Sequence, residues 1–581
     1  MQVQANLVLV DVVVTNNGAA VGGLTKDKFR IYENGNLQPI SVFEEHKLED
    51  SLQVANVPPK EPNIYNDFPE FTVPSAANVL LLDALNTPLS DQQYVRQQMI
   101  QYLKNIPPGT RIAVFTLASR LRIVEGFTTD SSVIAKALSG KGGPQQSVLL
   151  DNDADQESSD LVNDLTSIGA SGDATASLQQ FLADLASFQT DLRVRMTLDA
   201  MKELARYLNP IPGRKNLIWF SGSFPLAIDP DATLQSPFQA MRNYAADVRQ
   251  ADDMLSEARV AVYPVDARGL MSLPSTNASN RYSSTSGGGS GGLGGGGSRR
   301  GGHGSRMPGA GSGSAPGSNL PPAAAADQKF LQQTTLEHAT MKQIAEDTGG
   351  EAFMDTNGLK QAVAQAIANG SRYYTIGYVP QLKKYDGSFH RIKLSVDGGY
   401  QASYRRGYYA DGPVKAPIEP QAADNTMNQA VERGAPPLSQ ILFKVRVLAA
   451  DDPAAKGVKV STDPAGTRTA SLKGTVKRYL IDYAVDVRPI AFTATPDGVH
   501  HARLEFAVIA YDSDGRRLNF TDHGTAFNLP PTVYERILHT GAPMHQEIDL
   551  PAGRVYLRVV VHDLDSTRIG STEIPVTVAK Q

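Results

Sequence analysis

The chain has 581 residues, which is more than one hydrophobic core accommodates, because single cores stop growing at about 250 to 300 residues. Its 55 basic and 60 acidic residues give a formal net charge of −5, which argues against a nucleic-acid-binding protein, and no apolar run reaches the roughly 18 residues of a membrane span. The chain has 0 cysteines, so disulfides, thiolate metal sites and cysteine nucleophiles are excluded.

Residues 2–48 show the alternation of β-strands, as in "VQANLVLVDVVVT", and the turn signals "NNG" and "ENGN" interrupt the pattern. A sheet with so few strands is not stable by itself, so we expect these strands to pair with others elsewhere in the chain. The first residues lack the basic and apolar regions of a signal peptide. We therefore expect either a cytoplasmic protein or an exported one whose signal is not part of this sequence.

From about residue 74 apolar strands alternate with helices. "NVLLLDA" is apolar on both faces, and the next segment predicts a helix with Ser90 as its N-cap. "RIAVFTL" and "RLRIVEGFT" predict a hairpin, a long helical stripe runs to Leu208, and strands at 216–220 and in "RVAVYPVDA" flank a helix at 239–258. This order predicts a parallel sheet with helices on both faces.

A Gly/Ser-rich segment, residues 276–326, interrupts this α/β domain, because helical patterns resume in "TLEHATMKQIAEDTGG" and "LKQAVAQAIANGS". Gly/Ser chains bury too little apolar surface to offset the entropy lost on ordering, so we expect the insertion to be disordered. Its "SRRGGHGSR" stretch has two interpretations: a phosphate-contacting RGG segment, or a solvated loop. The α/β domain would span residues 74–371.

Three further period-2 strands lie within residues 372–411, and we expect them to form one β-sandwich with residues 2–48. The α/β domain would then be an insertion in that sandwich. Residues 412–437 have the Pro/Ala composition of a linker. Residues 438–581 contain many short strands with "PDG" and "SDG" turns, which predicts a separate immunoglobulin-like β-sandwich.

The series "NVLLLDALNT", "RIAVFTLASRLRIVEGFT", "RMTLDAMKELARYL", "NLIWFSGS" and "ARVAVYPVDA" resembles a von Willebrand factor type A domain. With "LTKDKFRIYENG", "IAEDTGGEAF" and "YYTIGYVP", the first 411 residues resemble the VWFA-related domain proteins of acidobacteria, which are usually exported. The resemblance implies a Rossmann-like α/β domain. It also implies a metal-ion-dependent adhesion site at the carboxyl ends of the strands, where open α/β sheets bind ligands.

The resemblance implies an Asp-x-Ser-x-Ser loop, a Thr in a second loop and an Asp in a third as ligands of Mg²⁺. Asp83 and Thr87 take the first and last places of the first loop, and Leu85 stands where the first Ser belongs. Thr197 fits the second loop, and Ser221 stands where the Asp of the third loop belongs. The expectation is a degenerate site, with Asn86 or Asp266 as residues able to compensate.

Two other patterns suggest chemistry less strongly. Asp151, Asp153 and Asp155 are spaced as in a calcium loop, but Gln156 and Val162 replace its Gly and Glu, so a solvated acidic loop explains them equally. Ser221 follows a strand as a nucleophile would, but the G-x-S-x-G pattern is missing, with Trp219 and Ser223 at the glycine places. Trp219, the single tryptophan, is expected in the core.

The sequence therefore predicts a non-enzymatic adhesion or protein-binding module of the bacterial cell envelope or exterior. Its partner would be a protein, bound at the carboxyl end of the type A domain sheet. No catalytic residue and no cofactor are expected, with Mg²⁺ as the one possible ligand of the degenerate site. The alternative is a hydrolase or other enzyme that uses the cleft near Ser221 and Asp83.

Overall fold

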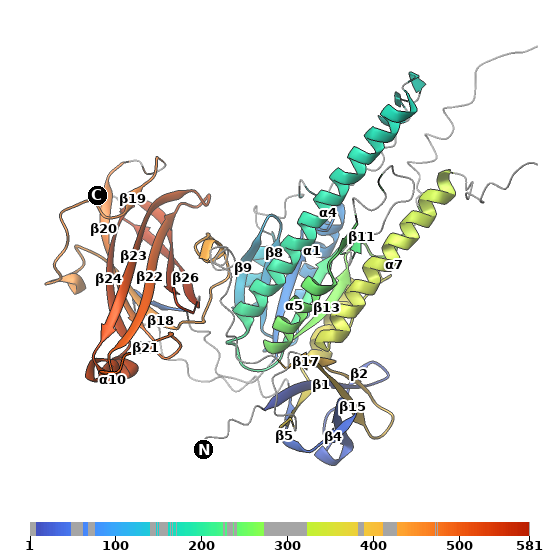
Figure 1. The fold of residues 1–581 in the computed structure, drawn as a ribbon, viewed down its shortest axis with the longest axis horizontal. Helices are drawn as coiled ribbons and strands as arrows, with labels where there is room; N and C mark the ends of the chain where they lie inside the picture. Colours follow the sequence, from blue (N-terminus) through green and yellow to red (C-terminus); the bar gives the residue numbers. More distant parts are fainter. Residues whose placement is uncertain are drawn as a thin grey trace, which may run out of the picture.

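The computed structural model contains three bodies: an α/β body in the centre, a small β body beneath it, and a larger β body beside it (Figure 1). The structure describes residues 7–47, 62–67, 76–139, 161–222, 241–271, 322–380, 388–410 and 427–579, apart from isolated positions, and a few residues in 147–149 and 224–236 and at 273. Within these ranges no helix is long and apolar enough to cross a membrane.

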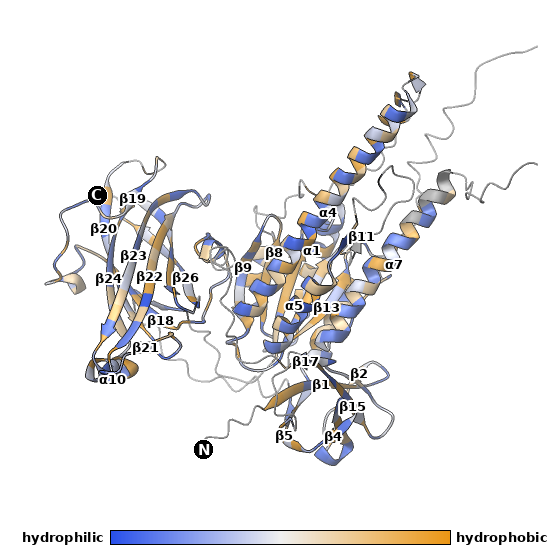
Figure 2. Ribbon diagram, viewed as in Figure 1, coloured by the Kyte–Doolittle hydropathy of each residue, from blue (hydrophilic) through white to orange (hydrophobic). Residues whose placement is uncertain are grey.

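The α/β body is built on one five-stranded sheet of order β13-β10-β7-β8-β9. Its strands are β7 (Ala77–Asp83), β8 (Ile112–Leu117), β9 (Leu121–Thr128), β10 (Lys215–Ser221) and β13 (Val260–Asp266). Neighbouring strands are parallel except β8 and β9, which form the expected hairpin. Every residue of β7, β10 and β13 is buried, and Figure 2 shows these strands as a hydrophobic layer between helices.

Helices cover both faces of the sheet. One face carries α1 (Leu89–Leu103), α2 (Ser131–Ser139) and α8 (Leu359–Gly370), and the other carries α4 (Gly172–Leu208), α5 (Ala245–Glu257) and α7 (Pro322–Thr348). Two predicted starts were wrong. α1 begins one residue before Ser90, after an extended Pro88, and Ser90 bonds Asp91 instead. The helix predicted at 239–258 begins at Ala245, because β12 (Arg242–Asn243) pairs with β11 (Ala227–Ile228).

α4 and α7 extend beyond the carboxyl end of the sheet (Figure 1). α4 has 37 residues, a length of about 55 Å, and its buried side chains begin only at Ser187. α7 starts at Pro322, so the predicted insertion, 276–326, ends too late. The reason is local: a run of alanines follows Pro322, and alanine has the highest helix propensity of all residue types. The rest of the insertion lies outside the described residues.

The small β body joins strands from both ends of residues 7–410. One sheet has the order β16-β1-β14-β5, and the other has the order β17-β15-β3-β4. The bounds are β1 Val8–Asn16, β3 Phe29–Glu33, β4 Asn36–Gln38, β5 Ile40–His46, β14 Tyr373–Tyr378, β15 Phe389–Val396, β16 Gln401–Ser403 and β17 Gly407–Tyr409, with β2 (Ala19–Ala20) beside β1. Asn34 and Gly35, both at positive φ, make the β3–β4 turn. The α/β body therefore lies between two groups of strands that form one sandwich, and the chain returns to that sandwich at β14, directly after α8.

The larger β body packs two sheets around one hydrophobic core. The first sheet has β18 (Phe443–Ala449), β20 (Val476–Val485) and β24 (Ala542–Pro551), and the second has β19 (Thr467–Arg468), β22 (His500–Tyr511), β23 (Arg517–Leu529), β25 (Gly553–Asp563) and β26 (Ile569–Val578). β21 (Thr493–Ala494) pairs with β22, and α10 (Pro531–Thr540) follows β23. One strand was not expected: β6 (Ile64–Asn66), from before the α/β body, pairs with β18.

The end of the segment predicted as a linker, 412–437, is packed rather than free. Arg558 on β25 is fully buried, and its guanidinium donates to the carbonyl oxygens of Ala430 (2.5 Å), Ala435 (2.8 Å) and Pro436 (2.9 Å). Burial lowers the pKa of Arg558 to about 10, which leaves it charged at neutral pH. The sequence could not predict these contacts, because any residue type supplies a backbone carbonyl.

The packed segment also connects the larger β body to the α/β body. The amide of Ile123 on β9 donates to the carbonyl oxygen of Gly434 at 3.0 Å, and Arg120 forms an ion pair with Glu432. Glu203 of α4 is buried at this junction. Burial raises the pKa of Glu203 to about 7, although the charges of Arg558, Arg206 and Arg120 act in the opposite direction.

Arg558→Met is expected to lower the free energy of unfolding of the larger β body by on the order of 3 kcal/mol, because three buried carbonyl groups lose their donor. Arg554→Met is the matched control, since Arg554 is exposed on the same strand. Thermal and urea unfolding of both variants measure the difference. Equal stability of the two variants would contradict the structural role of the Arg558 contacts.

Glu203→Gln is expected to change how stability depends on pH. The ordinary pKa of 4.5 rises to about 7 on folding, so between these values the folded state binds more protons than the unfolded state. Stability therefore falls as pH rises from 4.5 to 7, by about 3 kcal/mol at most. The variant should lack this slope, whereas Glu535→Gln, at an exposed site of α10, should keep it. Unfolding midpoints from pH 4 to 8 test this.

Candidate binding site at the carboxyl end of the sheet

Asp83, the last residue of β7, is buried and accepts hydrogen bonds from the loop that follows it and from strand β10. From its own loop, the backbone amide of Asn86 donates to Oδ1 at 3.0 Å and the Asn86 side-chain amide donates to Oδ2 at 2.8 Å. From β10, Trp219 Nε1 and Ser221 Oγ donate to Oδ2 at 3.1 and 2.9 Å. The carboxylate therefore fastens two adjacent strand ends together.

Asn86 extends this network to α4. Its side-chain nitrogen also donates to Thr197 Oγ1 at 2.7 Å, and Thr197 in turn donates to the carbonyl oxygen of Arg193 at 2.8 Å. The guanidinium of Arg193 lies within 3.5 Å of Asn86 Oδ1. Asn86 thus stands between the Asp and the Thr, where the resemblance places a metal ion. Arg193 went unnoticed in the sequence, although it precedes Thr197 by one helical turn.

The structure places the other predicted ligands as follows. Two of the predicted ligands lie in the network: Ser221 donates a hydrogen bond to Asp83, and Thr197 accepts one from Asn86. Thr87 faces a different group: its Oγ1 accepts from the amide of Gly222 at 3.0 Å. Gly222 is required there, since a Cβ would lie 2.7 Å from the carbonyl oxygen of Asn86. Leu85, in place of the first Ser, belongs to the hydrophobic core.

These groups do not fit a Mg²⁺ ion. Magnesium needs carboxylate or other oxygen ligands with open lone pairs, but the Asp83 carboxylate already accepts four hydrogen bonds. The positive charge of Arg193 nearby opposes a second cation. Burial also raises the pKa of Asp83, against the effect of its bonds from Asn86, Ser221 and Trp219. In the described part of the chain no three His, Asp or Glu side chains are grouped as metal ligands.

A second polar cluster lies beside the first, at the end of β13. Asp266 is buried, and its Oδ1 and Oδ2 accept hydrogen bonds from Arg268 Nε and Nη2 at 3.0 and 2.9 Å. His338 Nε2 lies 2.7 Å from Oδ2 of the same carboxylate. Arg268 also donates to Glu337 at 2.8 Å, which connects β13 to α7. Asp266 is thus committed to ion pairs and does not compensate for the missing ligand. The motif gave no indication of Arg268.

An enzyme that uses Ser221 would need an exposed hydroxyl beside a base. Ser221 is fully buried, and its Oγ donates to the Asp83 carboxylate. His338, the histidine at this edge, contacts Asp266. Trp219 is in the core as expected and also donates to Asp83. The calcium-loop candidates Asp151, Asp153 and Asp155 lie outside the described residues.

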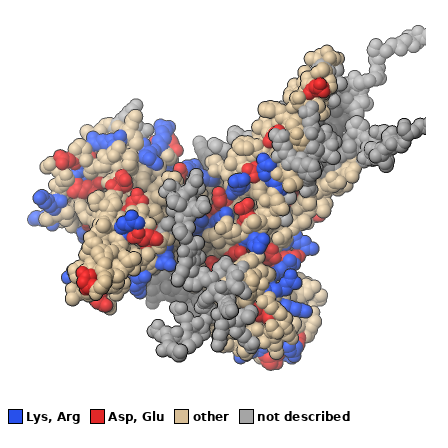
Figure 3. Space-filling view, in the orientation of Figure 1, with Lys and Arg blue, Asp and Glu red and all other residues tan. Residues whose placement is uncertain are grey.

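Above the two clusters, α4 exposes large apolar side chains. Phe181, Leu185 and Phe188 are 62%, 43% and 59% exposed, and their spacing of four and three residues puts them on one face of the helix. On α7, Leu331 and Leu336 are 53% and 43% exposed. In Figure 3 the upper part of α4 carries few charged groups. The carboxyl end of the sheet therefore lies at the base of two helices with exposed apolar residues.

No protein-family model and no curated protein matches the chain. Similar solved structures include the conserved hypothetical protein BatB from Bacteroides thetaiotaomicron (9% identity, TM-score 0.21, 50% of this chain and 97% of that one). They also include a von Willebrand factor type A protein from Catenulispora acidiphila (8% identity, TM-score 0.21, 94% of this chain and 75% of that one). A third is the type V pili tip protein Mfa5 from Porphyromonas gingivalis (7% identity, TM-score 0.21, 94% of this chain and 78% of that one). With TM-scores this low, we rest the function on the geometry of the site.

The wild-type protein is expected to show no Mg²⁺-dependent change in melting temperature, because four hydrogen bonds, two of them from Asn86, occupy the carboxylate of Asp83. The Asn86→Ser, Ser221→Asp double variant places a second carboxylate beside Asp83 and removes the amide. It should melt lower in EDTA and recover in millimolar Mg²⁺, since the cation relieves the repulsion between the carboxylates. Differential scanning calorimetry with and without EDTA measures both effects.

Asn86→Ser alone serves as the control, because it removes the amide without adding charge. A rise in the melting temperature of the wild type with Mg²⁺ that is lost in Asp83→Ala would contradict this account of the site.

Proposed function

We propose that the protein is a non-enzymatic, adhesion-type module that binds a protein partner at the carboxyl end of its parallel sheet without a metal ion. The observation that carries the proposal is the apolar face of α4 formed by Phe181, Leu185 and Phe188. Large apolar side chains grouped on an exposed helix face are typical of protein-binding surfaces. In a complex the two phenylalanines would be the energetic anchors.

The rigidity of the site supports the proposal. α4 is held to the sheet from Val194 onward by buried apolar residues, and the bonds through Thr197 and Asn86 fix its position over Asp83. A partner that docks on the upper half of α4 would therefore meet a surface that is already in place. A preformed surface loses less entropy on binding than a mobile one. The network around Asp83 then has a structural role, and not a ligand-binding one.

The buried hydroxyl of Ser221 and the ion-paired Asp266 favour binding over hydrolysis, because neither offers a reactive group to a substrate. As to location, we propose the cell envelope or exterior of a bacterium. The resemblance of the first 411 residues to exported VWFA-related proteins supports this, and the lack of cysteine is compatible with any redox environment.

The triple variant Phe181→Ser, Leu185→Ser, Phe188→Ser is expected to lose capture of the partner from native envelope extract by roughly 30-fold or more, as for the loss of one hot spot of about 2 kcal/mol. Leu37→Ser is the control, because Leu37 is an exposed leucine of the small β body. EDTA should leave capture unchanged. Capture that survives the triple variant but is abolished by EDTA would show that binding runs through a metal ion after all.

A further inference from the structure

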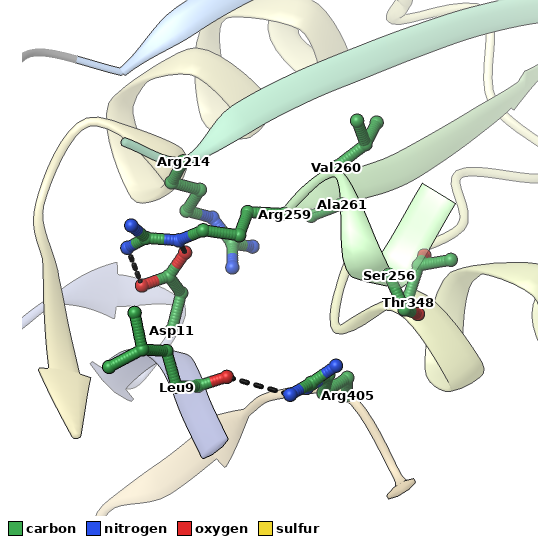
Figure 4. A pocket seen from close by; sticks show the side chains of 9 residues that line it. All are labelled: Leu9, Asp11, Arg214, Ser256, Arg259, Val260, Ala261, Thr348 and Arg405. Atoms are coloured by element: carbon green, nitrogen blue, oxygen red, sulfur yellow. Dashed lines mark hydrogen bonds and ion pairs between the residues drawn. The ribbon is translucent and has the colours of Figure 1, made fainter. Parts of the chain in front are cut away.

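A small cavity lies at the amino end of the parallel sheet, where the small β body meets the α/β body (Figure 4). Its volume of about 20 Å³ has room for one or two water molecules. Arg214 and Arg259 line it from just before β10 and β13, and Arg405 lines it from the segment between β16 and β17. Asp11 on β1 is the only acid among the described residues of this lining.

Asp11 is fully engaged by one of the three arginines. Arg259 Nε donates to Asp11 Oδ2 at 2.8 Å, a second bond runs from Arg259 Nη2 to Oδ1, and Thr375 Oγ1 also donates to Oδ1 at 2.8 Å. Burial alone would raise the pKa of Asp11, but the bonds and charge of Arg259 hold it below its ordinary value. This carboxylate therefore balances Arg259 and leaves the other two guanidinium groups without a bonded counter-charge.

Arg214 and Arg405 donate only to neutral acceptors among the described residues. Arg214 bonds the carbonyl oxygen of Gly349 at 2.8 Å, and the hydroxyl of Tyr263 at 3.1 Å. Arg405 Nη2 bonds the carbonyl oxygen of Leu9 at 2.8 Å, while its Nε is buried and has no hydrogen-bond partner. A buried N–H of a cation without an acceptor is costly, and an acceptor placed in the cavity would remove that cost.

A further basic residue, Lys215, follows Arg214 in the chain, and the charges of Asp11 and Glu257 act on Arg405 without a hydrogen bond to it. Burial and the neighbouring Arg259 lower the pKa of Lys215 to about 7, and burial lowers the pKa of Arg405 as well. Lys215 Nζ is turned to the carbonyl oxygen of Ala258, at 2.7 Å, and does not reach an acid. Uncompensated buried charge opposes folding unless a counter-ion is supplied.

We propose that this cavity binds one small monovalent anion of chloride size, held by Arg405 and Arg214. The small volume favours a single spherical ion over a larger polyatomic anion such as phosphate. Arg405 belongs to the small β body and Arg214 to the α/β body, so the anion joins the two bodies.

The test compares the wild type with Arg405→Lys, which keeps the charge but loses the buried Nε–H. At constant ionic strength, replacing gluconate by chloride should raise the melting temperature of the wild type by about 2–4 °C in a saturable manner. The shift should be lost in Arg405→Lys and kept in Arg30→Met, a change to an exposed, ion-paired arginine of the same β body. Line broadening in chloride NMR should follow the same order among the three proteins.

Three results would overturn the proposal. The first is an equal chloride effect in the wild type and in Arg405→Lys, which would indicate general screening. The second is stabilisation by phosphate but not by chloride, which would rule out an ion of this size. The third is the absence of line broadening in the wild type, because a stability-independent signal must accompany binding. The readouts do not involve the partner surface of α4, so this proposal and the proposed function fail separately.

Discussion

The carboxylate of Asp83 is the interaction on which the carboxyl end of the sheet depends. Four donors, two from the loop after β7 and two from strand β10, converge on it, and through Asn86 it is connected to α4. Because the group is buried, each lost donor would leave the carboxylate less well stabilised in a medium that solvates it poorly. The position of α4, and with it the apolar face above the sheet, follows from this network. A residue that resembles a metal ligand thus serves as a structural anchor.

Much of the α/β body is predictable from the sequence, because its signals are local. Strands apolar on both faces alternate with amphipathic helices, and that pattern allows few arrangements other than a covered parallel sheet. The pairing of β1 with β14 shows that residues 372–378 return to the N-terminal strands, as the need of those strands for partners suggested. Errors occur at helix starts, where a proline or a short bridge outweighs the capping preference of a single serine.

The details of the site were less predictable. A motif assigns ligands by spacing, at every second residue after Asp83, but the chain turns here so that the Asn86 amide bonds the Asp83 side chain. This turn aims the third residue at the carboxylate and leaves Leu85 in the core. The cavity lined by arginines and the bonds from Arg558 to backbone carbonyls could not be predicted either, because the residues that form them are far apart in the sequence.

β6 has a consequence for how the molecule is assembled. Asp67, next to β6, accepts the amide of Phe443 at 2.8 Å, across 376 residues of chain, and β6 lies along one edge of β18. During synthesis from the N-terminus, this strand emerges long before the sheet that receives it, and it must wait while the whole α/β body is made. A fragment that begins after residue 67 would leave the β18 edge open to pairing with other chains. The larger β body is therefore not an independent unit, although almost all of its strands and core residues lie within one stretch of sequence.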